Sequence, residues 1–251
     1  MIKFVTKYHK ERELILLKNK IFIAITLSWL LSIFVFNNYA DAKVIVESKD
    51  IIKDKPKIEL YIPQLRDLVD GNIQRQINQQ LTATTESALD DFNQLTNNML
   101  LSIKKGSLPA EYANRLTLVS DYEVKLLNKN IVSILQYGYQ DTGGAHPMPF
   151  AYAQTFNIKT GKNYALKDLF QPMSSFAYYL TEKIKLEIKL RNKQDNYIFT
   201  GLQEQQKFFL TREGLFIYYQ PYEIAPYSEG FIYFFFPYSD LPDIKLDEIL
   251  Y

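Results

Sequence analysis

Residues 115–158 read RLTLVSDYEVKLLNKNIVSILQYGYQDTGGAHPMPFAYAQTFNI, and their pattern is the clearest indication of the fold class. Its apolar and polar residues alternate with a period of two, which is typical of half-buried strands. Residues 128–130 supply a turn, and Gly143-Gly144 breaks the chain before the alternation resumes at Ala151. The pattern therefore predicts three consecutive antiparallel strands, a meander.

Helices are predicted on both sides of this meander in the sequence. Residues 70–105 carry apolar side chains at spacings of three, four and seven, which place them on one helical face. Ser174-Ser175 can cap a second, shorter helix that runs to about residue 191. Further strands are predicted within residues 43–65, 208–210, 215–219 and 231–236. The last of these is apolar on both faces, so we expect it in the centre of a sheet.

The order of these elements predicts an α+β fold, with one long and one shorter helix packed on a face of antiparallel sheets. We expect residues 1–42 to form a signal peptide or a membrane-anchor helix. Residues 43–105 would form an N-terminal subdomain of a strand and the long helix, and residues 115–251 a C-terminal α+β domain. Because a strand and a helix bury little surface by themselves, these two parts should share a sheet or a core.

The N-terminus predicts export. Residues 21–36 read IFIAITLSWLLSIFVF, an uncharged apolar run that follows six Lys/Arg and two Glu within residues 1–20. The small-residue pattern Ala40-Asp41-Ala42 comes next, and the three features together are typical of a secretory signal peptide. The alternative is an uncleaved anchor, for which the run is short, although a basic region of this length favours it. In both cases residues 43–251 lie outside the cytoplasm, secreted or anchored at the outer face of the cytoplasmic membrane.

Composition excludes several classes of function. The 251 residues include no cysteine, which excludes disulfide scaffolds, structural Cys–zinc sites and thiol catalysis. The net charge of the whole chain is +1, and the part after residue 42 carries a net charge of −2. Nucleic acid is therefore not an expected partner, and a membrane is expected only through residues 21–36 if they stay attached.

Catalytic motifs are scarce in the exported part. Its single histidine is His146, and it contains neither a G-x-S-x-G nucleophile elbow nor an H-E-x-x-H zinc motif. We therefore predict no catalytic residue, no metal site and no cofactor. The open alternative is a hydrolase that uses two carboxylates, for which Glu223 with Asp141 is the candidate pair.

Two segments stand out because of their glycine, proline and aromatic residues. Residues 140–149 and 220–230 each interrupt the strand pattern. They follow the predicted strands 131–139 and 215–219, which we place in one sheet, so we expect the two loops to form one surface. Paired glycines permit a sharp turn or close approach, and prolines stiffen a loop that presents aromatic side chains to a partner. The alternatives are a plain strand connection and a loop folded over the core. The predicted partner-binding residues are Gly143, Gly144, His146, Pro147, Pro221, Tyr222, Glu223, Pro226 and Tyr227.

A family resemblance rests on five motifs that occur in order. They are GGAHP (143–147), FNIKTGK (156–162), LKDLF (166–170), FLTREGL (209–215) and YQPYEIAPY (219–227). In these motifs the chain resembles the extracytoplasmic module of RsiV, the lysozyme-sensing anti-sigma factor, and the non-catalytic N-terminal region of the peptidoglycan deacetylase PdaC. The resemblance is strongest over residues 115–251.

The resemblance implies an exported bacterial α+β module, and in its RsiV-like members it implies that loops enter the cleft of lysozyme. Only about 20 residues precede the apolar run, which is short for a sigma-binding domain, so we do not carry over the anti-sigma function. We expect a non-enzymatic binding or sensing protein of the cell envelope, whose partner is a lysozyme-like protein or a peptidoglycan fragment. The alternatives are the carboxylate-dependent, peptidoglycan-active hydrolase and a structural envelope protein.

The first prediction concerns export. If Ala40-Asp41-Ala42 is a cleavage site, N-terminal sequencing of the exported protein will start at Lys43. A protein of full mass retained in the membrane fraction would instead assign residues 21–36 to an anchor.

Overall fold

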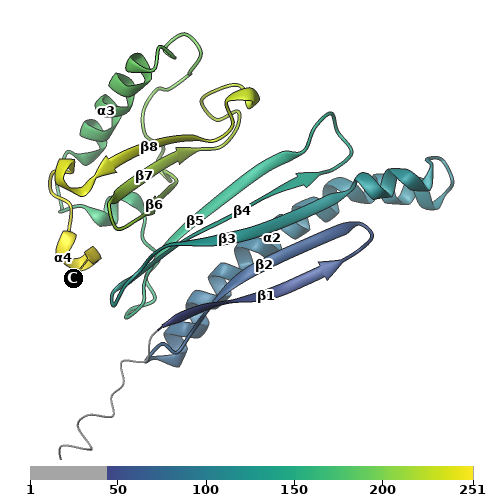
Figure 1. Ribbon diagram of the computed structural model, residues 1–251, viewed down its shortest axis with the longest axis horizontal. Coiled ribbons are helices and arrows are strands. Elements are labelled where there is room, and N and C mark those ends of the chain that lie inside the picture. Colours follow the sequence, from purple (N-terminus) through teal and green to yellow (C-terminus); the bar gives the residue numbers. More distant parts are fainter. Residues whose placement is uncertain (1–43, 251) are drawn as a thin grey trace, which may run out of the picture. The chain divides into compact units, whose positions relative to one another are not determined.

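The computed structural model describes residues 44–250, and these residues lie in one compact unit. The fold is α+β, as predicted: a five-stranded sheet, a three-stranded sheet and helices that cover them (Figure 1). The predicted signal or anchor segment lies outside the described residues. Among the described residues, no helix is both long enough and apolar enough to span a membrane.

The five-stranded sheet has the order β1 (Ile45–Lys53), β2 (Lys57–Arg66), β3 (Thr117–Leu127), β4 (Ile131–Asp141) and β5 (Met148–Asn157). Strands β3, β4 and β5 pair antiparallel, so the predicted meander is confirmed. Strand β2 pairs with β3 in parallel, which makes the sheet mixed instead of purely antiparallel. The reason is the connection: a long helix separates these two strands, and such a crossover returns the chain in the same direction.

The crossover is α2 (Gly71–Lys104), the predicted long helix, which packs against β2 and its neighbours. The Asp70 side chain caps its first turn by accepting from the N–H groups of Asn72 and Ile73. Buried Ile77, Leu81 and Phe92 lie on the sheet side, where they join apolar residues of β2, β3 and β4.

The three-stranded sheet has the order β6 (Phe208–Leu210), β7 (Gly214–Tyr219) and β8 (Ile232–Pro237), and α3 (Phe176–Leu190) covers one of its faces (Figure 1). Leu180, Ile184 and Ile188 of α3 belong to the same core cluster as the inward residues of all three strands. The remaining short helices are η1 (Ala110–Arg115), η2 (Leu166–Leu169), η3 (Tyr227–Glu229), η4 (Tyr238–Asp240) and α4 (Leu246–Leu250).

The prediction that residues 231–236 form a central strand is wrong, because β8 is an edge strand of its sheet. Its side chains alternate: Phe234 is fully buried, whereas Tyr233 and Phe235 are 37% and 39% exposed. These two rings lie among other aromatic side chains on the sheet face opposite α3. The ring centroids of Phe216 and Phe235 are 4.7 Å apart there. Residues 231–236 are apolar on both faces because the outward rings of Tyr233 and Phe235 belong to an aromatic cluster. Aromatic side chains of this kind can stay partly exposed to water.

Strand β5 forms one edge of the five-stranded sheet, and side chains from β7 and the residue after it cover that edge. The Ala151 N–H donates to Gln220 Oε1 (3.0 Å), and Gln220 Nε2 donates to Ala151 O (2.7 Å). The Ala153 N–H donates to Tyr218 Oη (2.9 Å), which in turn donates to Ala151 O (3.3 Å). Burial raises the pKa of Tyr218, so its hydroxyl keeps the proton that it donates.

Backbone groups of the following loop pair with the last residues of this edge. The Tyr164 N–H donates to Thr155 O (2.8 Å), and the Asn157 N–H donates to Lys162 O (2.9 Å). At the other end of the strand, Pro149 has no N–H to satisfy. Several outward backbone groups of β5, at Ala151, Ala153, Thr155 and Asn157, are thus paired within the chain, which makes this edge less able to recruit another strand.

The second prediction tests this cover. Tyr218→Phe keeps the buried ring but leaves the Ala153 N–H without a partner, so the free energy of unfolding should fall by about 1–3 kcal/mol. Urea unfolding at 25 °C measures this change. Tyr178→Phe is the matched control, because the Tyr178 side chain is 73% exposed, and it should unfold like the wild type. Equal unfolding free energies for the two variants would contradict the assigned role of Tyr218.

Candidate functional site

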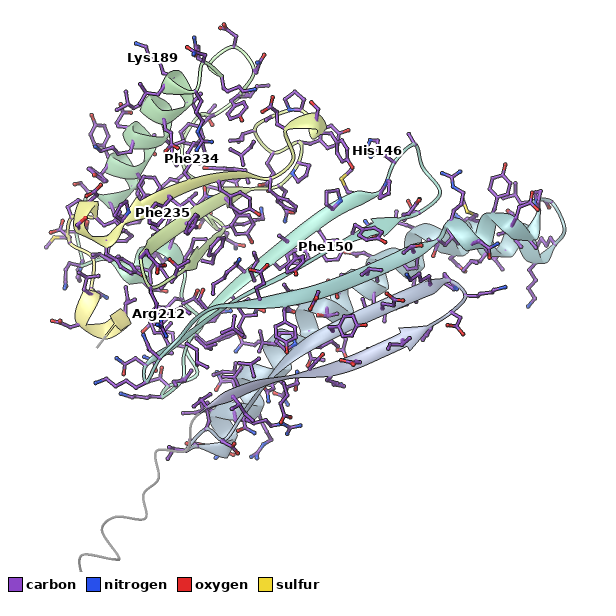
Figure 2. All side chains as sticks on the ribbon, viewed as in Figure 1. His146, Phe150, Lys189, Arg212, Phe234 and Phe235 are labelled. Carbon is purple, nitrogen blue, oxygen red and sulfur yellow. The ribbon has the colours of Figure 1, made fainter. Side chains whose placement is uncertain are left out.

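Two loops emerge beside each other from the two sheets. The glycine loop (residues 142–147) joins β4 to β5, and the tyrosine–proline loop (residues 220–231) joins β7 to β8. Figure 2 shows His146 at the tip of the glycine loop, next to the connection between β7 and β8. The two segments that the sequence singled out are therefore neighbours, as predicted. The expectation that both leave the same sheet is wrong, because β4 belongs to the five-stranded sheet and β7 to the three-stranded one.

Direct contacts link the two loops. Tyr227 Oη donates to Pro147 O at 2.7 Å, although the two residues are 80 positions apart in the sequence. The rings of His146 and Tyr227 stack with their centroids 4.0 Å apart, and Tyr222 lies 5.7 Å from Tyr227 on the same loop. The rings of His146, Tyr227 and Tyr222 thus lie side by side in a row where the two loops meet. We call His146, Pro147, Tyr222, Pro226 and Tyr227 the loop patch.

Helix α2 packs against the glycine loop, and Arg115 donates a hydrogen bond to it. Gly143 has a φ of +85°, a backbone conformation that favours glycine. A Cβ at this position would lie 2.5 Å from Met99 Cε, the end of a flexible side chain on α2 that packs under the loop. Asp141 accepts from the Gly143 N–H (2.8 Å), and Arg115 donates to Gly144 O (2.9 Å). Gly143 therefore shapes the loop, and Gly144 is exposed beside the patch.

The tyrosine–proline loop contains both anchored residues and exposed residues, which follow one another along the chain. Pro221 is buried, and Glu223 accepts from the Gln220 N–H (2.7 Å) and forms an ion pair with Lys207. Tyr222 has a φ of +70°, an uncommon conformation for a residue with a side chain, and this turns its ring outward to 59% exposure. Pro221 and Glu223 thus fix the loop, while Tyr222, Pro226 and Tyr227 are available to a partner.

The far end of the same loop is held by Glu229. Its carboxylate accepts from Lys193 Nζ (2.7 Å) and from Tyr197 Oη (3.1 Å). The hydrogen bond from Lys193 is the main cause that lowers the pKa of Glu229, and the same bond raises the pKa of Lys193. Both ends of the loop are therefore bonded to other parts of the unit, which limits the conformations that it can adopt.

Sequence reasoning missed the residues that position the patch. The Gln220 amide bonds Ala151 of β5, the Arg115 guanidinium bonds Gly144, and the Lys207 ammonium group pairs with Glu223. None of these three residues belongs to a periodic pattern. The available signal was that Gln220 is the first residue of the segment 220–230 that the sequence singled out.

The residues proposed for carboxylate catalysis are engaged locally. Asp141 bonds the glycine loop, and Glu223 is neutralised by Lys207. Within residues 44–250, no group of three or more His, Cys, Asp and Glu side chains is placed to hold a metal ion. What the geometry offers is a stiff, partly aromatic surface.

Two family models match parts of the chain. The model described as deacetylase PdaC matches residues 45–149, and the model described as a protein of unknown function, DUF3298, matches residues 167–239. The predicted likeness to the N-terminal region of PdaC is thereby supported, over an earlier stretch than the motifs suggested. The glycine loop lies in the first match and the tyrosine–proline loop in the second.

Two solved structures are similar in fold. A member of the DUF3298 family from Bacteroides fragilis NCTC 9343 has a TM-score of 0.56 at 19% identity, covering 78% of this chain and 90% of its own. A DUF3298 family protein from Pseudomonas aeruginosa PAO1 has a TM-score of 0.52 at 16% identity, covering 82% of this chain and 93% of its own. At these identities the likeness concerns the fold alone. None of the curated proteins compared with the chain matches it.

The third prediction concerns Glu229. Because its pKa is lowered in the folded protein, the bond to Lys193 is present above the ordinary glutamate pKa and is lost as the pH falls through the lowered value. An NMR titration of the Glu229 carboxyl carbon should give a midpoint below that of an unperturbed glutamate, and Lys193→Ala should raise it. A midpoint that Lys193→Ala leaves unchanged would contradict the pairing. Lys189→Ala, on the nearby helix α3, is the matched control.

Proposed function

We propose that this chain is an exported, non-enzymatic binding or sensing protein of the bacterial cell envelope. Its partner is a lysozyme-like protein or a cell-wall glycan, and the loop patch is the contact surface. The observation that carries the proposal is the junction of the two loops, where Tyr227 bonds Pro147 and stacks on His146.

The physical argument is preorganisation. A loop that is already fixed loses little conformational freedom when it binds, so more of the contact energy appears as affinity. The tyrosine–proline loop is bonded at Glu223 and at Glu229, and Tyr222 nevertheless exposes 59% of its side chain. Exposed tyrosines on a rigid support are typical anchors of protein interfaces, and their ring faces can also pack against sugar rings.

The comparisons support the envelope assignment. A model named after the deacetylase PdaC matches residues 45–149. The resemblance to the lysozyme-sensing module of RsiV rests on the five sequence motifs alone. The N-terminal charge and hydropathy pattern adds a route of export, secreted or anchored through residues 21–36.

The alternatives make different demands on the same residues. A carboxylate-dependent hydrolase needs a free acid, whereas Glu223 pairs with Lys207 and holds the backbone of Gln220. Turnover of labelled peptidoglycan that is lost on Glu223→Gln would favour this enzyme. A structural envelope protein would bind neither lysozymes nor glycan fragments.

The fourth prediction tests the proposal. Binding of a panel of lysozymes and muropeptides is measured by calorimetry, and Tyr222→Ala should then weaken the binding that is found by about 2 kcal/mol. Thermal unfolding should change little, since this side chain is largely exposed. Tyr178→Ala removes an exposed tyrosine on helix α3 and is the matched control, which should bind like the wild type.

Two outcomes would contradict this account. If the wild type binds no lysozyme and no muropeptide, the proposed function is wrong. If Tyr227→Ala unfolds the protein and Tyr222→Ala leaves binding unchanged, the tyrosine–proline loop covers the core and the patch is not the contact surface.

A further inference from the structure

A groove of about 580 Å³ lies away from the loop patch, between strands β1 and β2 and the first half of helix α2. All nine of its lining residues are polar or charged. Lys49, Arg66 and Arg75 carry positive charge, and Glu86 is the one acid among the lining residues. Because Glu47 pairs with Arg66, the excess positive charge of the groove comes from Lys49 and Arg75, within a region, residues 43–251, whose own net charge is negative.

Hydrogen bonds inside the groove leave mainly donors facing the open space. Gln64 Nε2 donates to Thr82 Oγ1 (3.1 Å), which leaves the Thr82 hydroxyl proton available for another acceptor. Gln74 Oε1 accepts from the Leu68 N–H (3.1 Å), so the oxygen of this amide is occupied while its NH₂ group keeps its donors. The groove thus offers amide, hydroxyl and cationic donors in one place.

The positions of these side chains are fixed by the same bonds. Asn78 accepts from the Leu65 N–H (2.7 Å) and donates to Leu65 O (3.0 Å), which joins α2 to β2 along the floor of the groove. Arg66 pairs with Glu47 (3.1 Å), and Arg75 donates to Asn72 on its own helix. Among the described residues, no ion pair involves Lys49 or Arg75, so both charges are available to a ligand.

We propose that this groove binds an anionic, hydroxyl-rich saccharide or polyol chain, with Arg75 and Lys49 on its carboxylate or phosphate groups. Charge-assisted hydrogen bonds to such groups are stronger than neutral ones. The amides of Gln74 and the hydroxyl of Thr82 bond the hydroxyl oxygens of the same chain. The inference rests on the proposed envelope location and adds a second contact for a glycan partner, separate from the loop patch.

The experiment uses residues 43–251, whose described residues lie in one compact unit. Calorimetry is run with three probes: an N-acetylmuramic acid-containing disaccharide, poly(glycerol phosphate) and a neutral N-acetylglucosamine oligomer. We expect binding of one or both anionic probes, weakened by salt, and at least about 10-fold weaker binding of the neutral oligomer. The anionic probe that binds identifies the source of the negative group.

Variants then locate the binding. Lys49→Gln/Arg75→Gln should weaken binding of the anionic probe at least about 10-fold, because both side chains are exposed and the fold should be unaffected. Lys104→Gln/Lys105→Gln makes the same change in net charge at the far end of α2 and should bind like the wild type. Circular dichroism checks that all variants are folded.

The results separate this inference from the proposed function. If no anionic probe binds, or if the neutral oligomer binds equally well, the groove inference is wrong, and lysozyme binding still decides the proposed function. If Tyr222→Ala abolishes binding of the anionic probe while the Lys49→Gln/Arg75→Gln variant binds normally, the saccharide contact belongs to the loop patch and the groove is again wrongly assigned.

Discussion

Strand β5 ends the five-stranded sheet, and its outward N–H and C=O groups must find partners if the edge is not to attract another strand. The side chains of Tyr218 and Gln220 supply these partners at Ala151 and Ala153. Tyr218 lies on β7, and Gln220 is the first residue after this strand. The same bonds therefore fix the three-stranded sheet against the five-stranded one. The contacts of Tyr218 and Gln220 thus protect the edge of β5 and also hold the two sheets together.

The loop patch follows from that arrangement. Gln220 is the first residue of the tyrosine–proline loop, and Ala151 lies only a few residues after the glycine loop, so their pairing brings the two loops to the same place. Tyr227 then bonds Pro147 and stacks on His146 without further movement of either strand. A surface that is assembled by strand positions is rigid before any partner arrives, which is the property that the proposed binding function requires.

Periodicity explains how much of this could be predicted from the sequence. The meander, α2 and α3 follow from periods of two and 3.6. The meeting of the two loops was predicted from strands of one sheet, whereas the loops leave different sheets and meet through contacts between them. The edge position of β8 was missed, because six consecutive apolar residues do not reveal that Tyr233 and Phe235 stay partly exposed. The parallel pairing of β2 with β3 and the role of Gln220 depend on contacts between distant segments, for which a single sequence carries no periodic signal.

The bonds of Gln220 to β5 hold the loop patch together, and an NMR measurement can follow this directly. We expect cross-relaxation between the ring protons of His146 and Tyr227 in the wild type, and its loss in Gln220→Ala while the remaining amide spectrum stays dispersed. Gln79→Ala, an exposed amide on α2, should keep the signal. A signal that persists in Gln220→Ala, or that is absent from the wild type, would contradict the account.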